Sequence, residues 1–315
     1  MRIVFMGTAE FALPSLYKLI MAGHDVVLVV TQPDRPRGRG RKVSSSPVKA
    51  LAEEFGINLF QPARIKDEEA VRTVKSYAPD LIAVVAYGQI LPREILYFPV
   101  YGCVNLHGSL LPRYRGPAPV QRAIMAGEKT VGVTTIYMDE TMDGGDIILQ
   151  RKVAISDDAT FGEVYQELSE IGGDLLLETV EQIEWGTAPR IPQDHSQATY
   201  APFIRAEDEM IDWSRGAREI FNQIRALNPE PGASTKMGGM RLKIFRARVV
   251  DEEESGACRG QVVNVVPDEG FVVQAGQGQL MILELQREGK RRLPAAEFMK
   301  GHPVQPGVVL GDVGE

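Results

Sequence analysis

Leu81-Ile-Ala-Val-Val-Ala86 is an unbroken apolar run that is rich in β-branched residues. Similar short runs occur at Ile3 to Met6, Val26 to Val30 and Val104 to Leu106, and stretches with helical spacing separate them. Strands that are apolar on both faces are typical of a parallel sheet covered by helices on both sides. The pattern therefore predicts a doubly wound α/β fold, in which sites lie at the carboxyl ends of the strands.

The pattern changes farther along the chain. Strands are expected at 133–137 and 147–155, on either side of an acidic turn from Asp139 to Asp146, and residues 161–184 have the spacing of a long amphipathic helix. Residues 186–202, rich in Pro, Gln, Ser and Thr, are typical of a linker. Short strands then recur at regular intervals, which predicts a small β-barrel. We expect a first domain over residues 1–186, a linker over 187–205 and a second domain over 206–315.

Composition excludes several classes of protein. The 315 residues are 44% hydrophobic and 24% charged, which is ordinary globular usage, and the net charge is −7. Cys103 and Cys258 lie far apart and form no CxxC motif, so neither a disulfide framework nor a structural zinc site is expected. No apolar run is long enough to span a bilayer, and the N-terminus lacks a signal-peptide pattern. We expect a cytoplasmic protein that binds no metal and no membrane.

Motifs of several enzyme classes are missing. The turn after the first strand has the single glycine Gly7 where a dinucleotide site has G-x-G-x-x-G, so a nicotinamide enzyme is disfavoured. No G-x-S-x-G, H-E-x-x-H or P-loop sequence occurs. The turn that begins at Asp139 resembles a calcium loop, but Gln150 stands at its twelfth position, where a bidentate Glu is required.

A basic loop follows the second predicted strand. Asp34 to Lys42 carries five cations against one carboxylate, in a chain that is acidic as a whole. The loop lies at the edge of the sheet where sites are expected, which favours polyanion binding there, although a solvated basic loop is the alternative. The cations of this loop are Arg35, Arg37, Arg39, Arg41 and Lys42.

Val104 to Pro119 carries the residues best suited to catalysis. Alternation along the predicted strand places Asn105 and His107 on one face at its carboxyl end. A neutral His can accept a proton, and an Asn amide can donate to a developing oxyanion. A carboxylate that orients the imidazole would come from the acidic turn. The candidates are Asp139, Glu140, Asp143 and Asp146.

These residues together resemble the methionyl-tRNA formyltransferase family. Asn-x-His followed by Ser-Leu-Leu-Pro and a distant Asp-x-Gly-Asp is the pattern of transferases that use 10-formyltetrahydrofolate. Further similarity lies in the Gly-Arg-Gly of the basic loop and in the stretches 117–122, 198–202, 211–213 and 224–229, so it covers nearly the whole chain. One position departs from the pattern, because Phe203 stands where relatives commonly carry a Lys, with Arg205 nearby.

The resemblance implies a catalytic Rossmann-like domain followed by a barrel similar to an oligonucleotide-binding fold. It implies formyl transfer from 10-formyltetrahydrofolate to the α-amino group of methionine on initiator tRNA, by a monomer that needs no metal. Asn105, His107 and Asp143 would be catalytic. Ser109, Leu110, Leu111 and Pro112 would contact the folate. Arg37, Arg39, Arg41, Lys42, Lys243 and Arg246 would contact the tRNA.

Other functions remain possible at this point. A formyltransferase acting on a small amine would need neither the basic loop nor the barrel. An RNA-binding protein without catalytic activity would leave Asn105, His107 and Asp143 without a purpose. A nicotinamide enzyme is weakened by the missing glycines.

Overall fold

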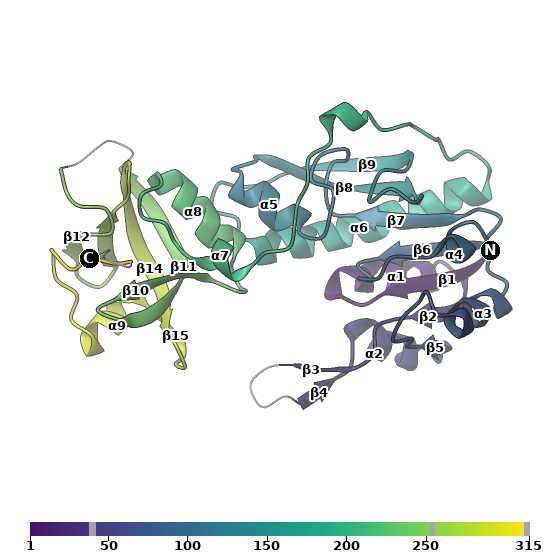
Figure 1. Ribbon diagram of the computed structural model, residues 1–315, viewed down its shortest axis with the longest axis horizontal. Coiled ribbons are helices and arrows are strands. Elements are labelled where there is room, and N and C mark those ends of the chain that lie inside the picture. Colours follow the sequence, from purple (N-terminus) through teal and green to yellow (C-terminus); the bar gives the residue numbers. More distant parts are fainter. Residues whose placement is uncertain (38–41, 252–255, 312–315) are drawn as a thin grey trace. The chain divides into compact units, whose positions relative to one another are not determined.

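The computed structural model describes residues 1–37, 42–251 and 256–311 (Figure 1). The chain forms two compact units. The first comprises 1–119, 130–154 and 165–201, and the second comprises 120–129, 155–164 and 202–315. The segment expected to be a linker thus belongs to the first unit as far as Ala201. Two short inner segments of the chain belong to the second unit, which a division into consecutive stretches of sequence could not foresee.

The first unit is built on a seven-stranded sheet with the order β5-β2-β1-β6-β7-β8-β9. The strands from β5 to β7 are parallel, whereas β8 is antiparallel to both of its neighbours. The chain therefore continues the doubly wound half with a hairpin that contains the acidic turn. The strands are β1 (Arg2–Gly7), β2 (Asp25–Val30), β5 (Leu59–Phe60), β6 (Leu81–Val85), β7 (Cys103–His107), β8 (Thr130–Tyr137) and β9 (Ile147–Ala154).

Helices cover both faces of this sheet, as the apolar strands predict. On one face, Val4 and Ile82 share a buried cluster with Val74 of α3 and Ile95 of α4. On the other, α6 approaches β7 so closely that a Cβ on Gly172 would lie 2.8 Å from the Leu106 side chain. The helical elements are η1 (Glu10–Ala12), α1 (Leu13–Met21), α2 (Pro47–Glu54), α3 (Glu68–Ser76), α4 (Arg93–Leu96), α6 (Phe161–Glu184) and η2 (His195–Gln197). The helix α5 (Pro119–Met125) belongs to the second unit apart from its first residue.

The second unit contains an antiparallel sheet with the order β10-β11-β14-β13-β12, and β15 pairs with β14. Its core includes Trp213, Ile224 of α8 and Phe298 of α9. The C-terminal segment closes the sheet, because Leu310 pairs with Met237 of β10 and Val309 pairs with Gln261 beside β12. Closure satisfies both edges, as in a barrel. The elements are α7 (Ala206–Glu209), α8 (Ala217–Ala226), β10 (Ala233–Met237), β11 (Met240–Asp251), β12 (Val262–Val266), β13 (Gly270–Gln274), β14 (Gln279–Arg287), β15 (Arg292–Pro294) and α9 (Ala295–Gly301).

The basic stretch after β2 is partly regular. Its ends form a two-stranded hairpin of β3 (Arg35–Arg37) and β4 (Lys42–Ser44), in which Arg37 is paired with Lys42. A loop was expected throughout, since nothing in a run of Arg, Gly and Pro has the alternation of a strand.

Candidate active site

The carboxyl end of β7 presents Asn105 and His107, two residues apart and hence on one face of the strand. The strand lies between β6 and β8, with Asn105 opposite Val84 on one side and Ile136 on the other. No described group hydrogen-bonds the side-chain amide of Asn105, which is partly exposed. The amide is therefore free to donate to a substrate oxygen.

His107 lies between two hydrogen-bond acceptors. Its side chain is 7% exposed, its Nε2 lies 2.9 Å from the carbonyl oxygen of Tyr114, and its Nδ1 lies 3.7 Å from Oδ2 of Asp143. A carbonyl oxygen can only accept, so Nε2 carries the proton of that hydrogen bond. A ring that is protonated on both nitrogens would face an acceptor on each side. The geometry is thus suited to an imidazolium paired with the Asp143 carboxylate.

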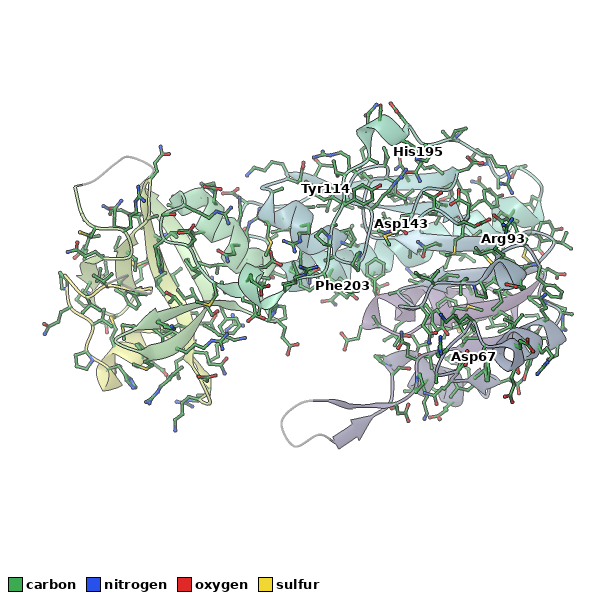
Figure 2. The ribbon with its side chains drawn as sticks, in the orientation of Figure 1. Asp67, Arg93, Tyr114, Asp143, His195 and Phe203 are labelled. Atoms are coloured by element: carbon green, nitrogen blue, oxygen red, sulfur yellow. The ribbon has the colours of Figure 1, made fainter. Side chains whose placement is uncertain are left out.

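Asp143 is held in the left-handed region, with φ of 50°. Its Oδ2 accepts the backbone N–H of Gly116 at 2.8 Å, which fixes the carboxylate beside His107. The following glycines have a steric reason, since a Cβ on Gly145 would lie 1.8 Å from the Tyr137 carbonyl oxygen. Figure 2 shows where Asp143 and Tyr114 lie in the fold.

The other acids of the turn have partners of their own. Asp139 accepts the N–H of Thr141 at 2.7 Å. Glu140 pairs with Arg93 at 3.2 Å, and Asp146 with Arg190 at 3.8 Å. Of the four candidates left open by the sequence, Asp143 is the one that faces His107.

Two residues that hold the Asp143 turn, Gln193 and Arg115, have no signal in the sequence pattern. Gln193 donates to the backbone carbonyls of Asp143 and Gly145, both at 2.8 Å, and accepts from the buried guanidinium of Arg115 at 2.6 Å. Gln193 belongs to the stretch expected to be a linker, and Arg115 to a loop. Long-range hydrogen bonds of this kind leave no periodic signal in a sequence.

The stretch expected to contact folate is extensively bonded within the chain. The Ser109 hydroxyl donates to the Arg113 carbonyl at 2.6 Å, and the Ser109 carbonyl accepts from Thr134 at 2.6 Å. The N–H of Leu111 donates to the same Thr134 hydroxyl at 3.2 Å. The structure thus gives these groups a role in shaping the loop after His107.

The residues expected to contact tRNA lie in both units. Arg39 and Arg41 fall in 38–41, outside the described residues. The backbones of Arg37 and Lys42 lie opposite each other in the β3–β4 hairpin. Lys243 is half-buried on β11 and lies 3.5 Å from Glu209. Arg246 is exposed on the same strand.

A β-bulge determines which cations of β11 point outward. The pairing with β14 shifts around Arg246, where Phe245 is buried beside an already buried Ile244. Strict alternation would place positions 243 and 246 on opposite faces, but the bulge resets the alternation. The basic residues of this strand therefore share the outer face of the sheet. They are Arg241, Lys243, Arg246 and Arg248.

Within the part of the chain that the structure describes, no three His, Cys, Asp or Glu residues are grouped as metal ligands would be. Across the same residues, no helix is both long and apolar enough to cross a membrane.

Comparison with known proteins matches residues 1–180 to the formyl transferase family and 203–303 to the formyl transferase C-terminal domain. A methionyl-tRNA formyltransferase of Pelotomaculum thermopropionicum is 51% identical over 312 residues, covering 99% of both chains. A solved methionyl-tRNA formyltransferase from Clostridium thermocellum has a TM-score of 0.57 and 22% identity, covering 79% of this chain and 93% of its own.

A second solved structure, HypX from Aquifex aeolicus in complex with tetrahydrofolic acid, has a TM-score of 0.64 at 24% identity. The match covers 95% of this chain, which spans about half (47%) of HypX. At this identity both solved structures support the fold alone. The full-length relative and the two matched domains carry the assignment further: this chain belongs to the methionyl-tRNA formyltransferases, enzymes of the formyl transferase family.

Proposed function

We propose that Asn105, His107 and Asp143 catalyse transfer of the formyl group of 10-formyltetrahydrofolate to the α-amino group of methionine on initiator methionyl-tRNA. Formylation of this tRNA is the activity of the family and serves translation initiation. The observation that carries the assignment of residues is the position of His107, whose Nδ1 lies 3.7 Å from the Asp143 carboxylate and which shares one face of β7 with Asn105.

The chemistry is direct attack of the amine on the formyl carbon. The amine must be neutral to attack, and an α-amino group titrates near pH 8. A new C–N bond forms, the formyl oxygen becomes an oxyanion, and the C–N bond to the folate nitrogen then breaks. The amine loses a proton and the departing nitrogen gains one, so the overall transfer is balanced.

Asn105 and His107 would stabilise the oxyanion. The Asn105 amide donates directly, as preorganised donors do at such sites. For His107 to donate as well, Nε2 would exchange the Tyr114 carbonyl, 2.9 Å away, for the substrate oxygen. Asp143 would then stabilise the positive charge of the ring and keep its plane fixed.

Binding of the two substrates would use different surfaces. The loop Ser109 to Pro112 follows His107 and would contact the folate, mainly through groups not already bonded within the chain. Arg39 and its neighbours, together with Lys243 and Arg246, would contact tRNA phosphates, which cations bind largely without regard to sequence. Translation initiation places the enzyme in the cytoplasm, and we propose that it acts as a monomer.

The decisive experiment compares acceptors. Purified protein is incubated with 10-formyltetrahydrofolate and either charged initiator tRNA, free methionine or an amino sugar nucleotide. Formylation of the charged tRNA, unchanged by a metal chelator, supports the proposal. Formylation of a small amine with the tRNA left untouched would contradict it.

A further inference from the structure

The segment Ile191 to Ala201 bonds to both sides of the candidate site. Ile191 exchanges two backbone hydrogen bonds with Ile147, at the start of β9 and just beyond the Asp143 turn, at 2.8 and 2.9 Å. At its other end, the Thr199 carbonyl accepts from Arg115 at 2.8 Å, and Ala201 donates to the Arg115 carbonyl at 2.7 Å. The segment therefore joins the turn that carries Asp143 to the loop that follows His107.

Gln193 is the centre of this connection. The residue is 7% exposed, and both hydrogens of its amide are used, on the carbonyls of Asp143 and Gly145. Its oxygen accepts from Nη2 of Arg115 at 2.6 Å. Apart from a second lone pair on that oxygen, every hydrogen-bonding group of the amide has a partner. Among side chains, only an amide offers two donors on one nitrogen beside an acceptor oxygen.

Arg115 fixes Gln193 in turn. It is 2% exposed, and its Nη2 also donates to Nδ1 of His195 at 3.1 Å, which orients the guanidinium from a second side. The residue after Arg115 is Gly116, whose N–H holds the Asp143 carboxylate. The side chain and the neighbouring backbone of Arg115 thus act on the same residue. Buried cations are costly, and one retained beside a catalytic turn calls for a reason.

The turn needs such support. Residues 139–142 are exposed, and Asp143 has a left-handed backbone, which L-residues adopt rarely, although Asp and Asn do so more readily than the others. The carboxylate must nevertheless stay close to His107, since the electrostatic benefit falls with distance. Two carbonyls held by Gln193 and one carboxylate oxygen held by Gly116 fix the residue at both its backbone and its side chain.

We propose that Gln193 and Arg115 are positioning residues for formyl transfer, which fix Asp143 so that its carboxylate faces His107. The inference rests on the proposed catalytic role of Asp143 and His107. It assigns a function to the segment Ile191 to Ala201 that neither the sequence pattern nor the family match supplies.

A double-mutant cycle tests this. Single-turnover rates of methionyl-tRNA formylation are measured for the wild type, Gln193→Ala, Asp143→Asn and the double variant. Gln193→Ala should lower the single-turnover rate about 100-fold, as misplacement of a catalytic group does. In steady-state kinetics, KM for either substrate should change little. In the Asp143→Asn background the same change should alter the rate less than about threefold, because the group it positions is already disabled.

Gln197→Ala is the matched control. Gln197 is an exposed glutamine of the same segment that donates to Asp194 at 2.7 Å, and its removal should leave the rate unchanged. If Gln193→Ala proves too unstable, by its melting temperature, Gln193→Glu replaces it in the cycle. That variant keeps the size and the acceptor for Arg115, but its ionised carboxylate has no N–H to donate to the carbonyls of Asp143 and Gly145.

The outcomes separate the two proposals. A wild type that formylates no tRNA overturns the proposed function. A wild type that does so, with a Gln193 variant that loses less than about threefold or loses the same factor in both backgrounds, overturns the positioning role alone. A large loss that disappears in the Asp143→Asn background supports it.

Discussion

Replacing Asp143 by Asn isolates the charge of the carboxylate from its shape. Asn is one of the few residues that tolerate the left-handed backbone, so φ of 50° should persist. The Asn oxygen can still accept the N–H of Gly116. The substitution therefore removes the negative charge opposite His107 while leaving the turn in place.

The expected size of the effect follows from the 3.7 Å between Nδ1 of His107 and Oδ2 of Asp143. Two unit charges at this separation attract by about 4 kcal/mol at an effective dielectric constant of 20, and by about 1 kcal/mol in bulk water. The side chains are 7% and 18% exposed, so the value should lie nearer the first limit. A loss of roughly 3 to 4 kcal/mol in the transition state corresponds to a rate lower by two to three powers of ten.

The assay is single-turnover formylation of charged initiator tRNA, with enzyme in excess, beside a thermal melt of each protein. We expect the loss in the chemical rate, with the melting temperature and the folate dissociation constant close to those of the wild type. A well-folded Asp143→Asn enzyme within about threefold of the wild-type rate would refute the reasoning. Even the attraction in bulk water, about 1 kcal/mol, corresponds to a loss of rate larger than about threefold.

Three further predictions concern other parts of the chain. Asn105→Ala should lower the rate about 100-fold through loss of an oxyanion donor, with KM for tRNA unchanged in steady-state kinetics; near-normal turnover would remove Asn105 from the site. Arg39→Ala should raise KM for tRNA about tenfold and leave KM for folate unchanged. Arg39→Lys should restore little, because a Lys lacks the planar guanidinium. Equal changes in KM for both substrates would mean that the basic loop is a solvated surface loop and not a tRNA contact. The hydrogen bond from Arg122 lowers the pKa of Asp208, so its stabilising effect is complete above the ordinary Asp range and is lost as the pH falls through the lowered pKa. The difference in melting temperature between wild type and Asp208→Asn should therefore be largest above pH 5 and narrow below pH 4; a pH-independent difference would mean that charge is not the cause.

Much of the fold could be predicted because it depends on local patterns. The long helix α6 begins and ends at Phe161 and Glu184, as the periodicity of residues 161–184 predicts. The short helix α5 was missed because it lies between prolines and glycines that are typical of a loop. Asn105 and His107 share a face through simple alternation along β7, and the choice of Asp143 among four acids required the family pattern.

The remaining features of the site arise from contacts between distant parts of the sequence. Gln193 and Arg115 are 78 positions apart, and Gln193 reaches Asp143 across 50. A polar residue in a stretch rich in Pro and Ser resembles a linker residue until its partners are known. Strand β7 carries Asn105 and His107, but a loop carries Asp143, and a loop needs such hydrogen bonds to hold a geometry.

The basic face of β11 depends on a feature that alternation cannot show. Lys243 and Arg246 are an odd number of positions apart, so a regular strand would turn one of them inward. The bulge around Arg246 adds Phe245 as a second consecutive buried residue, so that Lys243 and Arg246 both face outward. The guanidinium of Arg292 lies over the Phe245 ring, 4.2 Å from its centroid. The cations that result are not equivalent. Lys243 lies close to Glu209, whereas Arg246 is exposed, so a polyanion would displace fewer existing contacts at Arg246.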